Sequence, residues 1–303
     1  MARSRFRSDR GLTLRMGGVS FALGLLYVAF GAVLISVFFN GGGVGGGVIA
    51  LAIVLGMAWS QWYFSDTLAL KSMRAKVVEP HQAPELHAMI DRLCALADMP
   101  KPRVAVAETD IPNAFATGRT PSHSAVCVTT GILQRLTAEE LEGVLAHELA
   151  HVANRDVTVM TVASTLGLLA GFITRWGMYL GMGRSRDRNG AVGFLIVFLV
   201  SIVVYAISFV LTRSLSRYRE LSADRSGAYI TGKPSQLASA LSKISGDMAR
   251  IPSKDLRDTG AVSAFFFAPA LNRDSVSAMF STHPPLEKRI AQLQQISREL
   301  GEH

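Results

Sequence analysis

The chain has 303 residues, of which 49% are hydrophobic, with a mean hydropathy of +0.29 and a formal net charge of +8. This composition is too apolar for a routine soluble enzyme and indicates an integral membrane protein. The positive charges lie largely beside apolar segments, so we expect anionic lipid headgroups of a bilayer as a partner and do not expect nucleic acid.

The first 66 residues predict a basic segment followed by a transmembrane hairpin. Residues 17–39 contain no charged residue and are long enough to cross a hydrocarbon core of about 30 Å. Residues 48–64 form a second, shorter apolar stretch with aromatic residues at its end, and glycines within 41–47 predict the turn. Basic residues flank the pair on both sides and are absent from the turn. The positive-inside rule therefore predicts that both ends of the hairpin lie in the cytoplasm.

The following segment predicts a small mixed domain on the cytoplasmic side. Apolar residues at helical spacing predict a helix at 84–99, and runs with β-branched residues at 103–108 and 124–130 predict a small sheet. The segment Asn113–Gly118 between these runs is expected near a sheet edge, where an extended peptide could add as a strand. A plain hairpin connection is the alternative. The two cysteines are expected to be buried and reduced: Cys94 and Cys127.

The most informative motif is HELAH, in which His147 and His151 lie four residues apart and face the same way on a helix. Two such imidazoles can bind one Zn²⁺, with Glu148 beside the metal. Thr137 and Glu140 predict a capping box at the start of this helix, and an apolar stripe predicts that its opposite face is buried. The alternative is an ordinary amphipathic helix whose histidines and glutamate are solvated.

A second pair of apolar segments, residues 157–180 and 191–211, permits two interpretations. Both segments are long enough to span a bilayer. If both did, the loop that carries Arg184, Arg186 and Arg188 would lie outside the cytoplasm, which is unfavourable. We favour spanning. A hairpin that packs on the cytoplasmic domain or dips into the inner leaflet is the alternative.

A catalytic zinc site needs a third protein ligand and an open position for water. Glu220 and Asp224 lie four residues apart on one face of a predicted helix. We predict that Glu220 is the third ligand and that Asp224 accepts the free N–H of an imidazole, which fixes its tautomer. The alternative is a solvated acidic patch that meets Arg217 or Arg219.

The carboxyl-terminal region predicts a final helix with an apolar face over residues 286–296. His283 and Arg289 lie near its start and could stabilise the oxyanion that forms when water attacks a peptide carbonyl. A helix cap and a surface arginine are the equal alternative. The preceding residues 249–281 contain three consecutive phenylalanines and are interpreted either as a flap or as a membrane-touching loop.

Four motifs in this order resemble those of the HtpX-type membrane zinc metallopeptidases, a group within the gluzincin family that also includes the CAAX prenyl endopeptidases. The motifs are NAFATG at 113–118, HELAH extended to Asp156, ELSAD at 220–224 and HPPLEKR at 283–289. Together with the two apolar hairpins, they extend the resemblance over nearly the whole chain. The chain departs from the pattern at Leu221, where many relatives carry an aromatic residue, and in its basic second loop.

The resemblance implies one Zn²⁺ per chain and a role for each residue singled out above. The metal ligands would be His147, His151 and Glu220. The catalytic residues would be Glu148, His283 and Arg289, and Asp224 would orient a ligand. The substrate would contact Asn113, Ala114 and Phe115.

The expected fold is mainly α with a small β-sheet, in an integral membrane protein with transmembrane helices and a cytoplasmic gluzincin-like zinc metallopeptidase domain. The implied function is cleavage of misfolded or damaged membrane proteins, or unfolded polypeptides, during stress. We expect a multi-pass protein of the bacterial cytoplasmic membrane, with its active site and both termini cytoplasmic. The alternatives are a CAAX-type prenyl-protein endopeptidase and a non-enzymatic zinc-stabilised membrane scaffold. The expected boundaries are 1–66, 67–156, 157–211 and 212–303.

Overall fold

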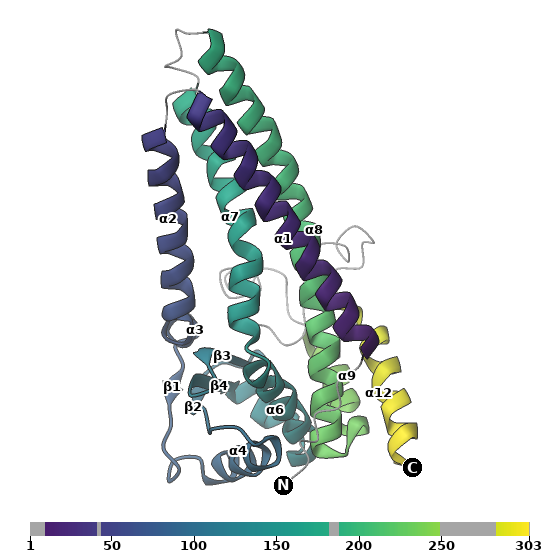
Figure 1. Cartoon of the computed structure of the whole chain (residues 1–303). Helices are drawn as coiled ribbons and strands as arrows, with labels where there is room; N and C mark the ends of the chain where they lie inside the picture. The colour runs from purple at the N-terminus through teal and green to yellow at the C-terminus, as the bar shows by residue number, and fades with distance from the viewer. Residues whose placement is uncertain (1–9, 41–43, 182–187, 249–282, 303) are drawn as a thin grey trace. The chain divides into compact units, whose positions relative to one another are not determined.

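The computed structural model of the chain describes residues 10–40, 44–181, 188–248 and 283–302 (Figure 1). Contacts divide the chain into two compact units. The first, the mixed unit, contains Met1–Thr13, Tyr63–Thr158 and Ser216–His303. The second, the helical unit, contains Leu14–Trp62 and Val159–Leu215.

The helical unit consists of long helices. They are α1 (Arg10–Asn40), α2 (Val44–Tyr63), α7 (Asp156–Gly181) and the first part of α8 (Arg188–Thr231). Apolar side chains from three of these helices form a shared core, in which Phe30 of α1 contacts Leu166 of α7 and Val204 of α8. Since each helix contributes a large buried side chain, burial of apolar surface stabilises the packing of the three helices.

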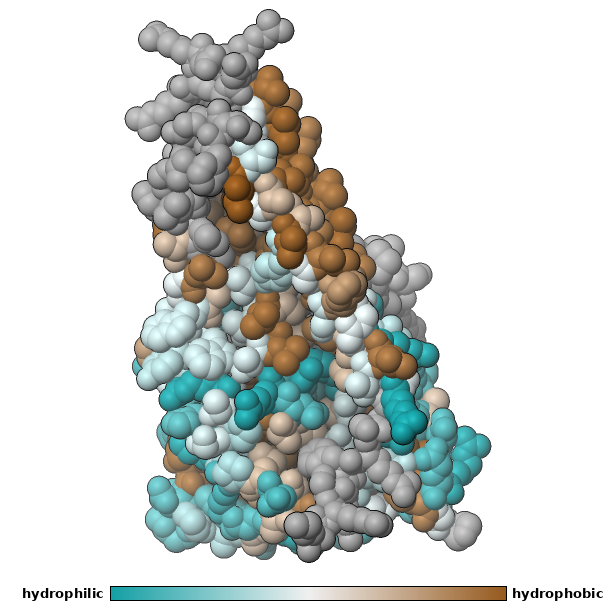
Figure 2. Space-filling view, viewed as in Figure 1, coloured by the Kyte–Doolittle hydropathy of each residue, from teal (hydrophilic) through white to brown (hydrophobic). Residues whose placement is uncertain are grey.

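Three helices in the described part of the chain are long and apolar enough to cross a membrane: Arg10–Ser36, Asp156–Thr174 and Leu195–Thr231. Large apolar side chains on them are exposed, including Phe21 (69%) and Val28 (71%). Figure 2 shows many brown residues along the long helices, interspersed with paler ones. Exposed apolar surface of this extent is typical of helices that face lipid.

The hydroxyl of Tyr27 joins α1 to the backbone of α7. It donates to the carbonyl of Val162 at 2.5 Å and accepts from the N–H of Leu166 at 2.8 Å. These two backbone groups are four residues apart, so an uninterrupted α-helix would bond them directly. The hydroxyl therefore bridges one step of the α7 hydrogen-bond ladder.

We expect the Tyr27→Phe variant to lose about 1 kcal/mol of stability, because both backbone groups lose their shared partner in apolar surroundings. The measurement is the unfolding midpoint of the purified protein in detergent micelles. Tyr205→Phe is the matched control, since Tyr205 lies on α8 with 46% of its surface exposed. Equal midpoints for the two variants would contradict this role of Tyr27.

The helices differ from the expected boundaries in three places. Helix α1 begins at Arg10, inside the segment predicted to be only basic, and the glycines at 45–47 lie within α2 instead of in the turn. Helix α8 runs without a break from the second apolar hairpin to the ELSAD motif. The expectations for residues 182–187 and 249–281 lie outside the described residues.

The sheet of the mixed unit has four strands in the order β1-β2-β4-β3. The strands are β1 (Lys76–Val77), β2 (Arg103–Ala107), β3 (Ala114–Thr120) and β4 (His123–Thr129). The two predicted runs are the parallel neighbours β2 and β4, and β1 and β3 are antiparallel to them. The segment predicted near a sheet edge is itself the edge strand β3, joined to β4 by a hairpin, so both interpretations of it describe part of the structure.

Besides α6 (Ala138–Ala153), the mixed unit contains shorter helices. They are α3 (Ser65–Ser72), α4 (Pro84–Ala97), α5 (Thr130–Arg135), α9 (Pro234–Met248) and α12 (Leu286–Leu300). Helix α6 contacts α4, α9 and the edge strand β3 (Figure 1). Its Leu145 and Leu149 are buried in one large cluster with Ile90 and Leu237. The prediction that Cys94 and Cys127 are buried free thiols is confirmed.

Candidate active site

The HELAH motif lies on α6, whose start is fixed as the sequence predicts. The Thr137 hydroxyl accepts the N–H of Glu140 at 3.3 Å, and the Glu140 carboxylate accepts the N–H of Thr137 at 2.9 Å. The helix is buried on both faces, because His147 is 1% exposed and Glu148 is 5% exposed. The alternative of a solvated histidine and glutamate face is therefore wrong.

Helix α8 approaches α6 closely at a glycine. A Cβ at Gly227 would lie 3.0 Å from the backbone N of His147, so a larger residue would force the two helices apart. Glu220 and Asp224 precede this glycine by two turns and one turn on the same helix. The close approach therefore brings both carboxylates to the histidines.

Three side chains from two remote stretches of the chain converge at this point. The Nε2 atoms of His147 and His151 lie 3.1 Å apart. The carboxylate of Glu220 lies 3.7 Å from Nε2 of His147 and 3.4 Å from Nε2 of His151. The potential ligand atoms of these three residues all lie within 4.8 Å of one another.

These separations fit a single tetrahedral metal ion. Ligand atoms about 2.1 Å from such an ion are about 3.4 Å from one another, which is close to all three distances. Two imidazole nitrogens and one carboxylate leave the fourth position for water, as in catalytic metal sites. Neutral imidazoles are needed, and burial lowers the pKa of His147 to about 4 against the opposing effect of Asp224. Against the opposing effect of burial, Glu220 and Glu148 raise the pKa of His151 in the metal-free protein.

His147 is oriented by the carboxylate predicted for this purpose. Its Nδ1 lies 2.9 Å from Oδ1 of Asp224, which is fully buried. Arg289 binds the same carboxylate through Nε at 2.7 Å and Nη2 at 2.6 Å. The first imidazole therefore contacts a buried Asp224–Arg289 ion pair, so the alternative of a solvated acidic patch is wrong.

His151 has its own carboxylate partner, which sequence reasoning did not assign. Its Nδ1 is 2.6 Å from Oδ2 of Asp156. Asp156 also accepts from Arg219, the residue that precedes Glu220. The sequence offered a faint signal, because Asp156 closes the extended HELAH motif, but it did not show that the backbone at Arg155 leaves the helical conformation and that Asp156 contacts His151.

Glu148 lies between the metal cluster and the edge strand. Its Oε2 accepts the backbone N–H of Ala116 in β3 at 2.9 Å. Burial raises the pKa of Glu148 to about 7, which the charge of Glu220 reinforces and that of His151 opposes. A carboxylate with a pKa near neutral can both take and return a proton at physiological pH.

The raised pKa of Glu148 predicts a pH-dependent stability of the metal-free protein. The folded protein retains a proton that the unfolded chain releases above pH 4.5, so its stability is complete below pH 4.5 and falls as the pH rises to about 7. The loss should reach about 3 kcal/mol. In excess chelator, the unfolding midpoint of Glu148→Gln should therefore exceed that of the wild type increasingly between these pH values. A constant difference would contradict the prediction.

The two carboxyl-terminal residues lie beside the same cluster. Nδ1 of His283 is 2.9 Å from Oε2 of Glu220, and Nη1 of Arg289 is 3.5 Å from the same oxygen. Arg289 is 2% exposed, so the interpretation of it as a surface arginine is wrong. His283 and Arg289 therefore both place a nitrogen atom near Glu220, the predicted third ligand.

The predicted substrate-binding residues lie at the start of the edge strand. Asn113 is fully buried, and its backbone N–H and carbonyl both bind the Thr129 hydroxyl, at 2.9 and 3.1 Å. Ala114 and Phe115 are 1% and 4% exposed. The side chains of Ala114 and Phe115 are buried in the core, so these two residues can contact a substrate only through their backbone.

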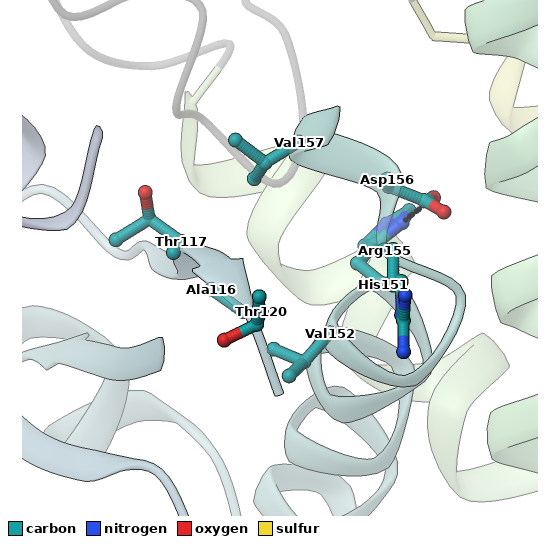
Figure 3. Close-up of a pocket in the computed structure, with 9 residues that line it drawn as sticks. Ala116, Thr117, Thr120, His151, Val152, Arg155, Asp156 and Val157 are labelled. Atoms are coloured by element: carbon teal, nitrogen blue, oxygen red, sulfur yellow. Dashed lines mark hydrogen bonds and ion pairs between the residues drawn. The ribbon is translucent and has the colours of Figure 1, made fainter. Parts of the chain in front are cut away.

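A small pocket opens beside His151 (Figure 3). Residues of β3 form one wall, and the end of α6 with the start of α7 forms the other. The lining residues are Ala116, Thr117, Gly118, Thr120, His151, Val152, Arg155, Asp156 and Val157. In Figure 3, Thr117 lies on the strand across the pocket from Val152 and His151 on the helix.

Comparison with known proteins agrees with this geometry. The model of peptidase family M48 matches residues 80–297, which include all four motifs. The chain belongs to peptidase family M48. Among curated M48 relatives, the Streptomyces coelicolor protein "Protease HtpX homolog 1" is 56% identical over 99% of this chain and 97% of its own length. The "Protease HtpX homolog" of Moorella thermoacetica is 52% identical over 99% of both chains.

The fold of this M48 peptidase is also found in a solved structure. The crystal structure of S. mikatae Ste24p matches with a TM-score of 0.56 and 18% identity, covering 94% of this chain and 67% of that chain. This likeness confirms the expected fold class, and the relatives confirm the HtpX-type resemblance. The chain is thus a membrane metallopeptidase with a His-His-Glu cluster suited to a metal ion.

Proposed function

We propose that this metallopeptidase binds one Zn²⁺ through His147, His151 and Glu220 and hydrolyses peptide bonds of unfolded or damaged membrane proteins. The observation that carries the proposal is the set of three donor atoms at tetrahedral spacing, with Glu148 buried beside them. Imidazole and carboxylate ligands with one open position are the donor set of catalytic zinc. When bound, Zn²⁺ lowers the pKa of its water and polarises a carbonyl.

In this mechanism Glu148 is the general base and then the general acid. Its carboxylate takes a proton from the attacking water and returns it to the leaving amine. The N–H of Ala116 holds Oε2 at 2.9 Å, which fixes the orientation of the carboxylate relative to the edge strand. Proton transfer then needs no rearrangement of α6.

His283 and Arg289 assist the transition state. The negative charge that develops on the carbonyl oxygen is stabilised by nearby donors or positive groups. His283 at 2.9 Å from Glu220 is the nearer candidate for direct contact. The side chain of Arg289 is buried in contact with Glu220 and Asp224 and contributes its positive charge from that position.

The substrate is recognised as an added β-strand on β3. This strand has β4 on one side only, so an extended peptide can pair with the opposite side. Hydrogen bonds to the substrate backbone depend little on the substrate's side chains. This mode of binding therefore suits unfolded polypeptides of varied sequence. The pocket beside His151 is placed to receive one substrate side chain.

The proposal places the active site and both termini in the cytoplasm, in a multi-pass protein of the bacterial cytoplasmic membrane with a role in stress. Support comes from the positive-inside pattern, the long apolar helices and relatives named as HtpX proteases. Single cysteines at Arg119 and Arg186 in an otherwise cysteine-free chain test the topology by labelling in intact cells. Labelling of both from the outside would overturn the cytoplasmic placement.

Metal removal tests the proposed chemistry directly. The purified protein should contain one zinc per chain and cleave casein and an unfolded membrane protein. Chelation should abolish both cleavages, and stoichiometric Zn²⁺ should restore them, because Glu148 alone neither lowers the pKa of the water nor polarises the carbonyl. Undiminished cleavage after complete zinc removal would overturn the proposal. A prenylated peptide with a carboxyl-terminal CAAX sequence serves as the control substrate and should not be preferred.

A further inference from the structure

We propose that Asp156, held by Arg219, is a positioning residue that fixes the tautomer and orientation of His151 at the metal site. The inference rests on the proposed function, because it takes His151 as a metal ligand. Asp156 would orient His151 as Asp224 orients His147. The two imidazoles would then be oriented by two separate carboxylates.

The contact defines which nitrogen of His151 carries a proton. Nδ1 lies 2.6 Å from Oδ2 of Asp156, and an ionised carboxylate can only accept, so Nδ1 is the donor. The lone pair of neutral His151 is then on Nε2. This atom faces Nε2 of His147 at 3.1 Å and Oε1 of Glu220 at 3.4 Å. Asp156 therefore leaves the correct nitrogen free for a metal ion.

His151 depends on such a partner more than His147 does. The side chain of His147 is 1% exposed, and the backbone of His147 packs closely against Gly227 of α8. The side chain of His151 is 17% exposed and forms part of the wall of the pocket in Figure 3. Packing alone leaves this ring more freedom to turn, so its orientation rests on the bond to Asp156.

Arg219 holds Asp156 in place and ties it to the end of α6. Its Nη2 donates to Asp156 and, at 2.8 Å, to the carbonyl of Asn154, the residue that ends α6. Between these two residues Arg155 has a φ of +54°, so the helical conformation is interrupted before α7 begins. Arg219 precedes Glu220 on α8. The helix that supplies the third ligand therefore also holds Asp156, the partner of the second ligand His151.

The experiment measures zinc affinity of the full-length protein in detergent micelles by competition with a chromophoric chelator. Loss of an orienting partner of a ligand histidine typically costs 10- to 100-fold in metal affinity. We expect Asp156→Ala to weaken zinc binding by this factor. Asp156→Asn should weaken it less, because the amide oxygen still accepts from Nδ1. Cobalt-substituted Asp156→Ala should also show altered visible absorption bands, which a merely structural defect elsewhere would leave unchanged.

The matched control is Asp66→Ala. Asp66 lies in the first turn of α3 and pairs with Arg103, as Asp156 lies in the first turn of α7 and pairs with Arg219. Their side chains are 12% and 10% exposed, but Asp66 has no contact with a ligand histidine. Both substitutions remove a carboxylate paired with an arginine near a helix start. Only Asp156→Ala should change zinc affinity beyond twofold.

Three results would overturn the inference. Zinc affinity of Asp156→Ala within twofold of the wild type would show that His151 needs no orienting carboxylate. An equal loss in Asp66→Ala would show that the effect is general destabilisation. A wild-type protein that binds no zinc would overturn the proposed function and this inference with it, whereas a wild type that binds one zinc isolates the role of Asp156.

Discussion

The Glu148→Gln variant should retain one zinc per chain and lose proteolysis by about 10²–10⁴-fold, the usual contribution of a general base. The amide has nearly the shape of the carboxylate, and its oxygen can still accept the N–H of Ala116, which lies 2.9 Å from Oε2 in the wild type. It cannot take a proton from water. The measurements are metal content and the rate of casein cleavage on the same preparation.

Glu142→Gln is the matched control on the same helix. Glu142 is also buried, at 8% exposure, but it pairs with Arg92 at 2.6 Å and lies outside the metal cluster. This variant should cleave casein at the wild-type rate. A Glu148→Gln protein that is fully loaded with zinc and cleaves at an undiminished rate would refute the assignment of the base.

The parts of the site that sequence predicted are those encoded by local spacing. The capping box at Thr137 and Glu140 sets where α6 begins, and four-residue spacing then places His147 and His151 on one face. The helical period also predicted that Asp224 would stand one turn beyond Glu220. The relative positions of residues within a few turns of one helix do not depend on tertiary structure. These predictions therefore followed from the sequence alone.

The parts that sequence did not predict depend on close approach between remote segments. The backbone N–H of Ala116 reaches Glu148 because the segment expected to lie near an edge is the edge strand itself. Asp156 reaches His151 because the chain turns sharply at Arg155. A backbone donor has no sequence signature, and an aspartate five residues after a histidine has no helical register with it. Neither contact could be read from spacing.

The burial of Arg289 also depends on contact between remote segments, so the sequence did not predict it. Its position near the start of a helix predicted either a surface residue or a group at the oxyanion, but the structure buries it against Asp224 with two hydrogen bonds. We expect Arg289→Met to lower the free energy of unfolding of the metal-free protein by about 3–5 kcal/mol, because Asp224 would remain as a buried, unpaired charge. Unfolding in detergent micelles with excess chelator measures this.

A double variant separates this structural role from the one in the reaction. Adding Asp224→Asn to Arg289→Met removes the unpaired charge, while the amide can still accept from Nδ1 of His147, so part of the lost stability should return. Any loss of turnover in the zinc-loaded double variant beyond that of Asp224→Asn alone then reports the role of Arg289 in the transition state. Arg298→Met on the exposed face of α12 is the control and should unfold as the wild type does. If Arg289→Met unfolds within 1 kcal/mol of the wild type, Asp224 does not depend on Arg289, and the buried pair is not what holds His147 in place.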